Sequence, residues 1–323
     1  MKTTPLMKGA MIAVRDCMGV KKEEKVVVIT DTGKIDIAKS FLFALHALGV
    51  DATLSLMVPR SHHVEEPPRE IGVAMASVDV ALLVTTASLS HTYARMEATK
   101  KGVRIASMPG ITEDMLTVGA MTADYEKVSE LSWKLTHLLG ATDLVEIYTE
   151  KGTDVRLSLK GRKPVIPPDD GLYRERGRWG NLPAGEAFIA PVEESVEGIV
   201  VVDGSMSPVG LLAEPIKFTI QRGKAVKIEG GREAEELSRF LEELSDPYAY
   251  WVGELGIGTN EKARITGNIL EDEKALRTVH IALGMNVSMG GKVESKTHND
   301  GIIRNPTVKF DGELIMDKGV LMV

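Results

Sequence analysis

The sequence predicts an α/β fold made of a Rossmann-like, doubly wound domain over residues 1–142 and an α+β domain over residues 143–323. Two observations predict this division. In the first part, short apolar runs alternate with helix-like segments, which is the pattern of a parallel sheet. After Gly140, short strand-like runs follow one another with Gly and Pro between them, which indicates a mixed or antiparallel sheet.

The first part begins with a predicted helix over residues 7–20, because apolar side chains recur there on one helical face. A predicted strand over 25–30, a helix over 34–48 and a strand over 51–57 then form a strand–helix–strand unit. Parallel strands need a crossover of this kind. The pattern continues with predicted strands over 78–85 and 103–108 and predicted helices over 91–100 and 122–140.

The second part opens with a predicted hairpin, since Leu144–Tyr148 and Asp154–Leu159 alternate in polarity around a short turn. One amphipathic helix is predicted over 232–245. Acidic side chains suit a helix N-terminus, so the charged run from Glu271 to Lys274 is predicted to be a solvated helix start. Further short strands are predicted over 198–203, 216–220, 224–229 and 306–310.

Composition restricts the class of protein. The 323 residues are 43% hydrophobic and 26% charged, which is typical of a globular chain with a full core. The net charge of -7 disfavours a nucleic-acid binder, which would carry a basic face. A single cysteine, Cys17, fits a reducing compartment. No signal peptide or membrane-spanning run is recognisable, so we expect a cytoplasmic protein that binds neither membranes nor nucleic acids.

Histidine and carboxylate side chains gather in the second part. His298 and Asp300 are two residues apart in an extended segment, so both face the same side. His280 lies in an apolar run, Glu186 ends a turn-rich loop before apolar residues, and glycines flank Glu254. Taken singly, each has an ordinary alternative as a core histidine or a solvated glutamate. Together they predict a metal site, because zinc, manganese, cobalt and non-haem iron take imidazole and carboxylate ligands.

His91 is a candidate in the first part. It starts a predicted helix directly after a strand, at the edge of an open α/β sheet where ligands bind. We therefore predict that it faces the substrate; the alternative is a capping segment with Ser90 as the N-cap. The segment Asp31–Lys34 lacks the glycine spacing of a phosphate-binding loop, so no nucleotide cofactor is predicted.

Four segments carry a resemblance to a known family: Asn181–Glu186, Gly253–Gly256, Thr278–Gly284 and Thr297–Asp300. They resemble the ordered motifs of the thermophilic metallo-aminopeptidases, aminopeptidase T and aminopeptidase S. The resemblance implies a homodimeric hydrolase that removes N-terminal residues from peptides through a metal-bound water. It implies two divalent ions (Zn, Co or Mn), with Glu254 bridging them or accepting the proton of the water. The implied ligands are Glu186, Glu254, His280, His298 and Asp300.

The sequence departs from that family in two informative respects. Met285, Asn286 and Val287 stand where those peptidases have a tyrosine that assists catalysis, and the chain is shorter than theirs. A non-catalytic protein that binds a metal or a ligand is therefore kept as a further interpretation.

A more distant resemblance connects the chain to the 2,5-dihydroxypyridine dioxygenases. Gly177–Gly180, Gly290-Gly291 and the His298-x-Asp300 pair carry it. It implies one Fe(II) held by His298, Asp300 and one further ligand, and it places His91 where those enzymes have a proposed catalytic histidine.

The candidate ligands distinguish the two families. Glu254 stands where the dioxygenases have their first iron-binding histidine, and their counterpart of His280 is not a ligand type. The ligand types therefore favour the aminopeptidase interpretation, with the dioxygenase as the alternative and a small molecule or short peptide as substrate.

Overall fold

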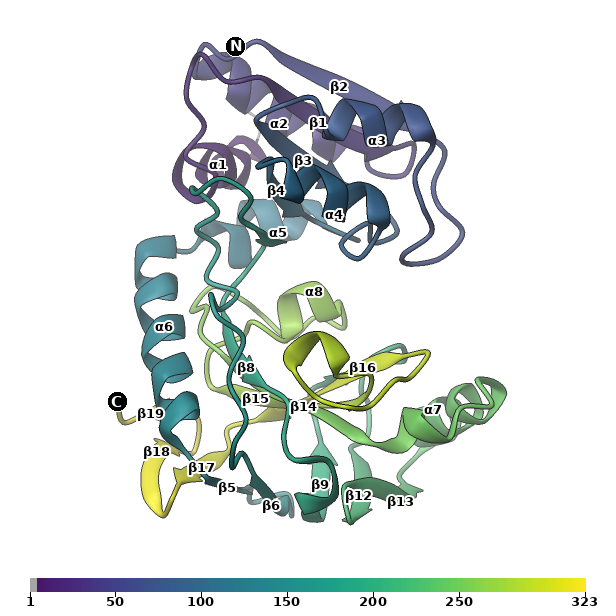
Figure 1. Cartoon of the computed structure of the whole chain (residues 1–323). Helices are drawn as coiled ribbons and strands as arrows, with labels where there is room; N and C mark the ends of the chain where they lie inside the picture. The colour runs from purple at the N-terminus through teal and green to yellow at the C-terminus, as the bar shows by residue number, and fades with distance from the viewer. Residues whose placement is uncertain (1–4) are drawn as a thin grey trace. The chain divides into compact units, whose positions relative to one another are not determined.

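The computed structural model describes residues 5–323, which form two compact units (Figure 1). The first unit comprises the chain up to Ser129 together with Asp169–Ala184, and the second comprises Glu130–Pro168 and Gly185–Val323. These ranges differ from the predicted division at residue 142. One part of the difference arises because a strand within Asp169–Ala184 pairs with the first sheet, and a pairing over such a distance leaves no local signal in the sequence. The other part is that the chain from Glu130 onward belongs to the second unit.

The first unit is built on a parallel sheet of five strands in the order β2-β1-β3-β4-β7. The chain adds β2 on one side of β1 and then crosses to add β3 on the other side, and this switch in strand order is also found in doubly wound sheets. Every residue of β1, β3 and β4 is buried, which explains their unbroken apolar runs. The predicted α/β class with a parallel sheet is thus confirmed. The strands are β1 (Val26–Asp31), β2 (Ala52–Met57), β3 (Val80–Val84), β4 (Arg104–Ser107) and β7 (Trp179–Asn181).

The four helices predicted for the first part have counterparts in the structure, whereas the short helices α3 and α5 were not predicted. Thr92, not Ser90, caps α4: its Oγ1 accepts a hydrogen bond from the Arg95 backbone N–H at 3.3 Å. The alternative interpretation, with Ser90 as the N-cap, is therefore wrong, and Ser90 instead donates to the Ser107 hydroxyl at 2.8 Å. None of the described helices is long and apolar enough to cross a membrane. The helices up to residue 141 are α1 (Met7–Met11, continued by a π-helical turn Ile12–Cys17), α2 (Ile35–Ala47), α3 (Arg69–Met75), α4 (Tyr93–Lys100), α5 (Glu113–Thr117) and α6 (Tyr125–Ala141). Most of α6 belongs to the second unit.

The second unit contains two antiparallel sheets. An eight-stranded sheet has the order β13-β12-β9-β6-β5-β17-β18-β19, and a six-stranded sheet has the order β11-β10-β16-β15-β14-β8. Apolar side chains from both sheets form one core, with Ile147 and Leu157 from the first and Leu255 and Ile281 from the second. The bounds in the larger sheet are β5 (Leu144–Tyr148), β6 (Asp154–Ser158), β9 (Glu197–Val202), β12 (Ile216–Gln221), β13 (Lys224–Glu229), β17 (Thr307–Phe310), β18 (Glu313–Asp317) and β19 (Val320–Leu321).

The smaller sheet carries the functional candidates of this unit. Figure 1 shows its strands β8, β14, β15 and β16, and the short helix α8 (Ile269–Asp272) belongs to the same unit. Helix α7 (Arg232–Glu243) contacts the larger sheet at β12 and β13. The bounds in the smaller sheet are β8 (Glu186–Ile189), β10 (Ser205–Met206), β11 (Gly210–Leu211), β14 (Val252–Gly258), β15 (Thr278–Gly284) and β16 (His298–Arg304).

The acidic run at α8 is buried, so the prediction of a solvated helix start is wrong. Glu271, Asp272 and Lys274 each expose 1% or less of their surface. Asp272 accepts hydrogen bonds from the backbone N–H groups of Thr266 and Gly267 at 2.7 and 2.8 Å. Acidic residues do stand in the first turn of α8. The preference of acidic residues for a helix N-terminus does not reveal whether they are exposed, because partners from other segments leave no local signal.

Candidate metal centre

The five predicted ligands lie together on the six-stranded sheet of the second unit. Glu186 begins β8, Glu254 lies in β14 and His280 lies in β15. His298 and Asp300 occupy alternate positions of β16, as their spacing predicted. Four adjacent strands therefore bring donors from well-separated segments to one place.

Small residues make room for these side chains. Ala282 lies between Glu254 and Asp300 in the strand register. Gly256 lies opposite His280, and a Cβ at Gly256 would stand only 1.9 Å from the His280 Nε2 atom. A side chain at position 256 would therefore displace the imidazole. The intervening residue Leu255 points into the hydrophobic core instead, so the strand alternates between core and centre.

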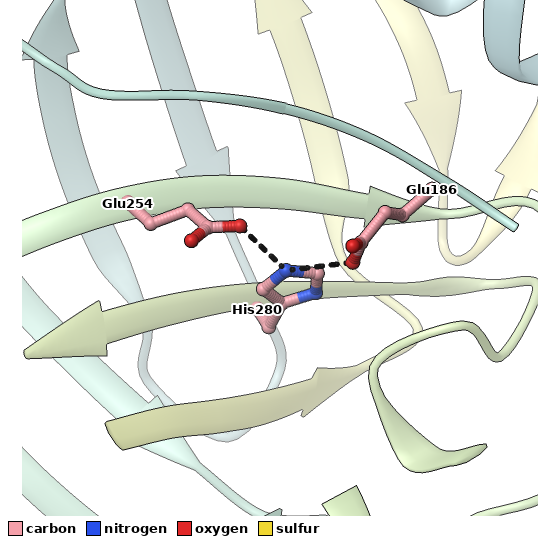
Figure 2. Close-up of side chains that lie close together, drawn as sticks. All are labelled: Glu186, Glu254 and His280. Carbon is pink, nitrogen blue, oxygen red and sulfur yellow. Dashed lines mark hydrogen bonds and ion pairs between the residues drawn. The ribbon is translucent and has the colours of Figure 1, made fainter. Parts of the chain in front are cut away.

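Glu186 and Glu254 approach His280 from opposite sides (Figure 2). The His280 Nε2 atom lies 3.3 Å from Glu254 Oε1 and 3.4 Å from Glu186 Oε2. All three side chains are buried. We call Glu186, Glu254 and His280 the inner triad.

A second group uses the other oxygen of Glu254. Glu254 Oε2 lies 3.0 Å from His298 Nε2, which in turn lies 3.4 Å from Asp300 Oδ1. We call Glu254, His298 and Asp300 the outer triad, because His298 exposes 29% of its side chain. In each triad, one donor atom per residue lies within 4.8 Å of the others, so the three can reach a common ion. The donor chemistry and spacing thus fit a divalent metal.

The backbone orients the exposed imidazole. His298 Nδ1 lies 2.7 Å from the Met285 carbonyl oxygen, which can only accept a hydrogen bond. Nδ1 therefore carries a hydrogen, and Nε2 faces the carboxylates, where it can bind a metal once its own proton is released. Metal-bound histidines are usually held in this manner by a partner on the other ring nitrogen.

The charges of the cluster perturb the pKa values of its members. Burial alone would lower the pKa of His280, but the hydrogen bond with Glu254 and the nearby carboxylates raise it to about 9. Burial alone would also lower the pKa of His298, but the charge of Asp300 raises it well above its usual value. Burial alone would raise the pKa of Glu254, but its hydrogen bonds with His280 and His298 hold that pKa well below the usual range. Without a metal, both imidazoles therefore carry protons near neutral pH.

Metal binding is expected to release protons and to strengthen as the pH rises. A ligand imidazole must be neutral, so an ion at the outer triad displaces the proton that the carboxylates hold on His298. The apparent affinity for Zn²⁺ or Mn²⁺ should rise by about tenfold per pH unit for each displaced proton, up to the raised pKa of the imidazole. Calorimetric titration in two buffers of different ionisation enthalpy measures the release. An affinity independent of pH would contradict this assignment.

A buried lysine also belongs to the cluster, and the sequence analysis missed it. Lys274 exposes 1% of its side chain, and its Nζ lies 2.6 Å from Glu186 Oε1 and 2.7 Å from Glu273 Oε1. Burial raises the pKa of Glu273, while the charge of Lys274 opposes this rise. No signal in the sequence identified Lys274, because a lysine within an acidic run is ordinarily exposed.

His91 lies in the first unit, so its predicted role beside the metal stays a prediction. It is exposed, between β3 and α4, and its ring meets Trp179 edge-on with 5.7 Å between centroids. The Arg95 guanidinium lies 3.7 Å from the centroid of the same Trp179 ring, and burial lowers the pKa of Arg95 to about 10. The indole is thus held between a buried cation and an accessible imidazole.

Comparison with known sequences identifies the family. The sequence pattern of the NicX family, described as 2,5-dihydroxypyridine 5,6-dioxygenase, matches residues 9–323. The 2,5-dihydroxypyridine 5,6-dioxygenase of Pseudomonas putida is 26% identical over 255 residues, which cover 74% of this chain and 70% of that protein. Aminopeptidase AmpS of Bacillus subtilis is 27% identical over 187 residues, which cover 51% of this chain and 44% of that protein.

Solved structures show the same fold in both groups. The Pseudomonas putida KT2440 2,5-dihydroxypyridine dioxygenase matches with a TM-score of 0.82 at 20% identity, over 98% of this chain and 97% of that one. AmpT of Thermus thermophilus matches with a TM-score of 0.71 at 19% identity, over 99% of each chain. The ligand types favoured the aminopeptidases, but the chain is more similar to the dioxygenases, and its relation to the aminopeptidases is distant. With the match extending over residues 9–323, this chain belongs to the NicX family.

Proposed function

We propose that the chain is a mononuclear Fe(II) dioxygenase that opens the ring of a small hydroxylated aromatic compound of the dihydroxypyridine type. The outer triad carries this proposal. It offers one imidazole and two carboxylates, its imidazole, His298, is accessible to solvent, and the chain belongs to the NicX family. These three side chains would hold Fe(II), which would supply the redox chemistry needed to use oxygen.

The protein's own groups would position and balance this centre. His298, Asp300 and Glu254 are the ligands, and the Met285 carbonyl fixes the ring of His298. His280 holds the second oxygen of Glu254 and so limits its rotation. These contacts order the donors before a metal arrives, which reduces the entropy lost on binding.

His91 is proposed to handle a proton of the substrate. An imidazole can accept the proton of a ring hydroxyl near neutral pH. Its exposure, and its place after a strand of the parallel sheet, support this assignment.

A dinuclear hydrolase of the aminopeptidase type is the second candidate, and one observation favours it. The two oxygens of Glu254 serve different triads, as a carboxylate bridging two ions would. Two ions would lower the pKa of a shared water. The metals would then be Zn, Co or Mn, the substrate a short peptide and the assembly a homodimer.

The two candidates differ in metal and in co-substrate. The protein would first be loaded with Fe(II) under anaerobic conditions. When oxygen and a dihydroxypyridine are then added, we expect oxygen consumption, and we expect Asp300→Asn to abolish it. His91→Ala should lower kcat at unchanged iron content, whereas the exposed His46→Ala serves as a matched control. Release of nitroaniline from amino-acid p-nitroanilides by the Zn, Co or Mn form, without oxygen consumption, would favour the hydrolase. Bound metal with neither activity would favour the non-catalytic binding protein.

A further inference from the structure

We propose that Lys274 is a built-in cation that neutralises Glu186 and so restricts the centre to one divalent ion, held by the outer triad. This inference rests on the proposed metal-dependent function and adds which residue limits the centre to one ion. The residue that decides the number is outside both triads.

The contacts of Glu186 show why the inner triad binds a divalent ion less well than the outer triad. Its Oε1 atom lies 2.6 Å from Lys274 Nζ, and only Oε2 faces His280, at 3.4 Å. The same Nζ atom also forms an ion pair with Glu273 at 2.7 Å, so it is held between two carboxylates. An ion at the inner triad would therefore share the carboxylate of Glu186 with a cation that is already in place.

The lysine is fixed by the fold. Its backbone N–H donates to the Glu271 carbonyl at 3.0 Å, and its carbonyl accepts from the Asn260 N–H at 2.9 Å. The side chain exposes 1% of its surface, so it cannot swing into solvent when a metal approaches. A second ion would have to bind beside this ammonium, where little water screens the repulsion between two cations.

The outer triad has no such competitor. Among the described residues, the carboxylates of Glu254 and Asp300 form ion pairs with histidines alone. The Lys274 Nζ atom occupies one oxygen of Glu186 from a buried, fixed position, whereas the oxygens of Glu254 and Asp300 face imidazoles that are ligand types themselves. This difference in partners selects the outer position.

The number of bound ions tests the proposal directly. Wild-type protein and four variants would be saturated with Mn²⁺ or Zn²⁺ alone, freed of excess metal by gel filtration and analysed by plasma mass spectrometry. We expect one ion per chain in the wild type. We expect two in Lys274→Gln, which keeps a hydrogen-bond donor toward Glu186 but removes the charge. Lys274→Met with Glu273→Gln removes the pair together and should also bind two.

Two controls separate charge from disturbance of the site. Lys274→Arg retains the cation, and Glu273→Gln removes the lysine's other partner while retaining the ammonium; both should bind one ion. Circular dichroism establishes that each variant is folded. Two ions in the wild type, or one ion in both folded variants that lack the cation, would overturn the proposal, as would two ions in Glu273→Gln.

The outcome is independent of turnover. One ion per chain without oxygen consumption would leave the role of Lys274 standing and reject the dioxygenase. Two ions in a wild-type protein that consumes oxygen would reject the role of Lys274 alone. A wild type that binds no ion would reject both.

Discussion

Replacing His298 with alanine is expected to abolish tight metal binding. The imidazole is the sole nitrogen ligand of the outer triad, and its Nε2 atom lies 3.0 Å from Glu254 and 3.4 Å from Asp300. Without it, only the two carboxylates of Glu254 and Asp300 remain as ligands of the triad. Loss of an outer-shell partner alone typically costs about 10- to 100-fold in affinity, so loss of this ligand should exceed about a hundredfold.

Competition with a chromophoric chelator measures that loss for Mn²⁺ or Zn²⁺. His46→Ala, which removes an exposed imidazole from α2, is the matched control and should bind metal as the wild type does. The parallel sheet of the first unit contains none of the five ligands, so the variant should keep that unit folded. Unchanged affinity in His298→Ala would remove His298 from the ligand set.

Gly256→Ala is expected to destabilise the second unit and to disturb the inner triad. The added Cβ would lie 1.9 Å from His280 Nε2 and 2.2 Å from its Cε1, so the ring or the strand must move. Overpacking of a buried site typically costs about 1 to 3 kcal/mol in the free energy of unfolding. Denaturant unfolding followed by circular dichroism measures this cost.

Gly140→Ala is the matched control, because the nearest atom to its Cβ would be 3.4 Å away and the residue lies in α6. Alanine there should be neutral or stabilise the helix by up to about 1 kcal/mol. A double variant identifies the cause: His280→Ala removes the ring, so Gly256→Ala should then cost much less. Strict additivity of the two substitutions would show that the clash with His280 is not the reason.

Local periodicity predicted the features that depend on neighbours in the sequence. The apolar run of β1 reads as a buried strand because both of its faces are covered. His298 and Asp300 share a face because side chains alternate along a strand. These patterns record burial and direction, and both survive in a single sequence.

Contacts between distant segments were not predictable in this way. Lys274 meets a carboxylate that stands 88 positions away, and β7 joins a sheet whose other strands end at Ser107. The exchange of Ser90 for Thr92 as the cap of α4 has a smaller cause, since either side chain can accept the same bond. The ligand types also misdirected the choice of family, because they describe one site, whereas the family match extends over the chain.

Glu254 makes the two triads thermodynamically dependent on each other. One carboxylate serves both imidazoles, with Oε1 toward His280 and Oε2 toward His298. An ion on the outer side withdraws negative charge from the inner side, so His280 holds its proton less firmly. Linkage is reciprocal, and a proton leaving His280 must therefore tighten the ion by the same factor. A single glutamate would thus couple the charge of the partly exposed triad to a fully buried imidazole through its own two oxygens.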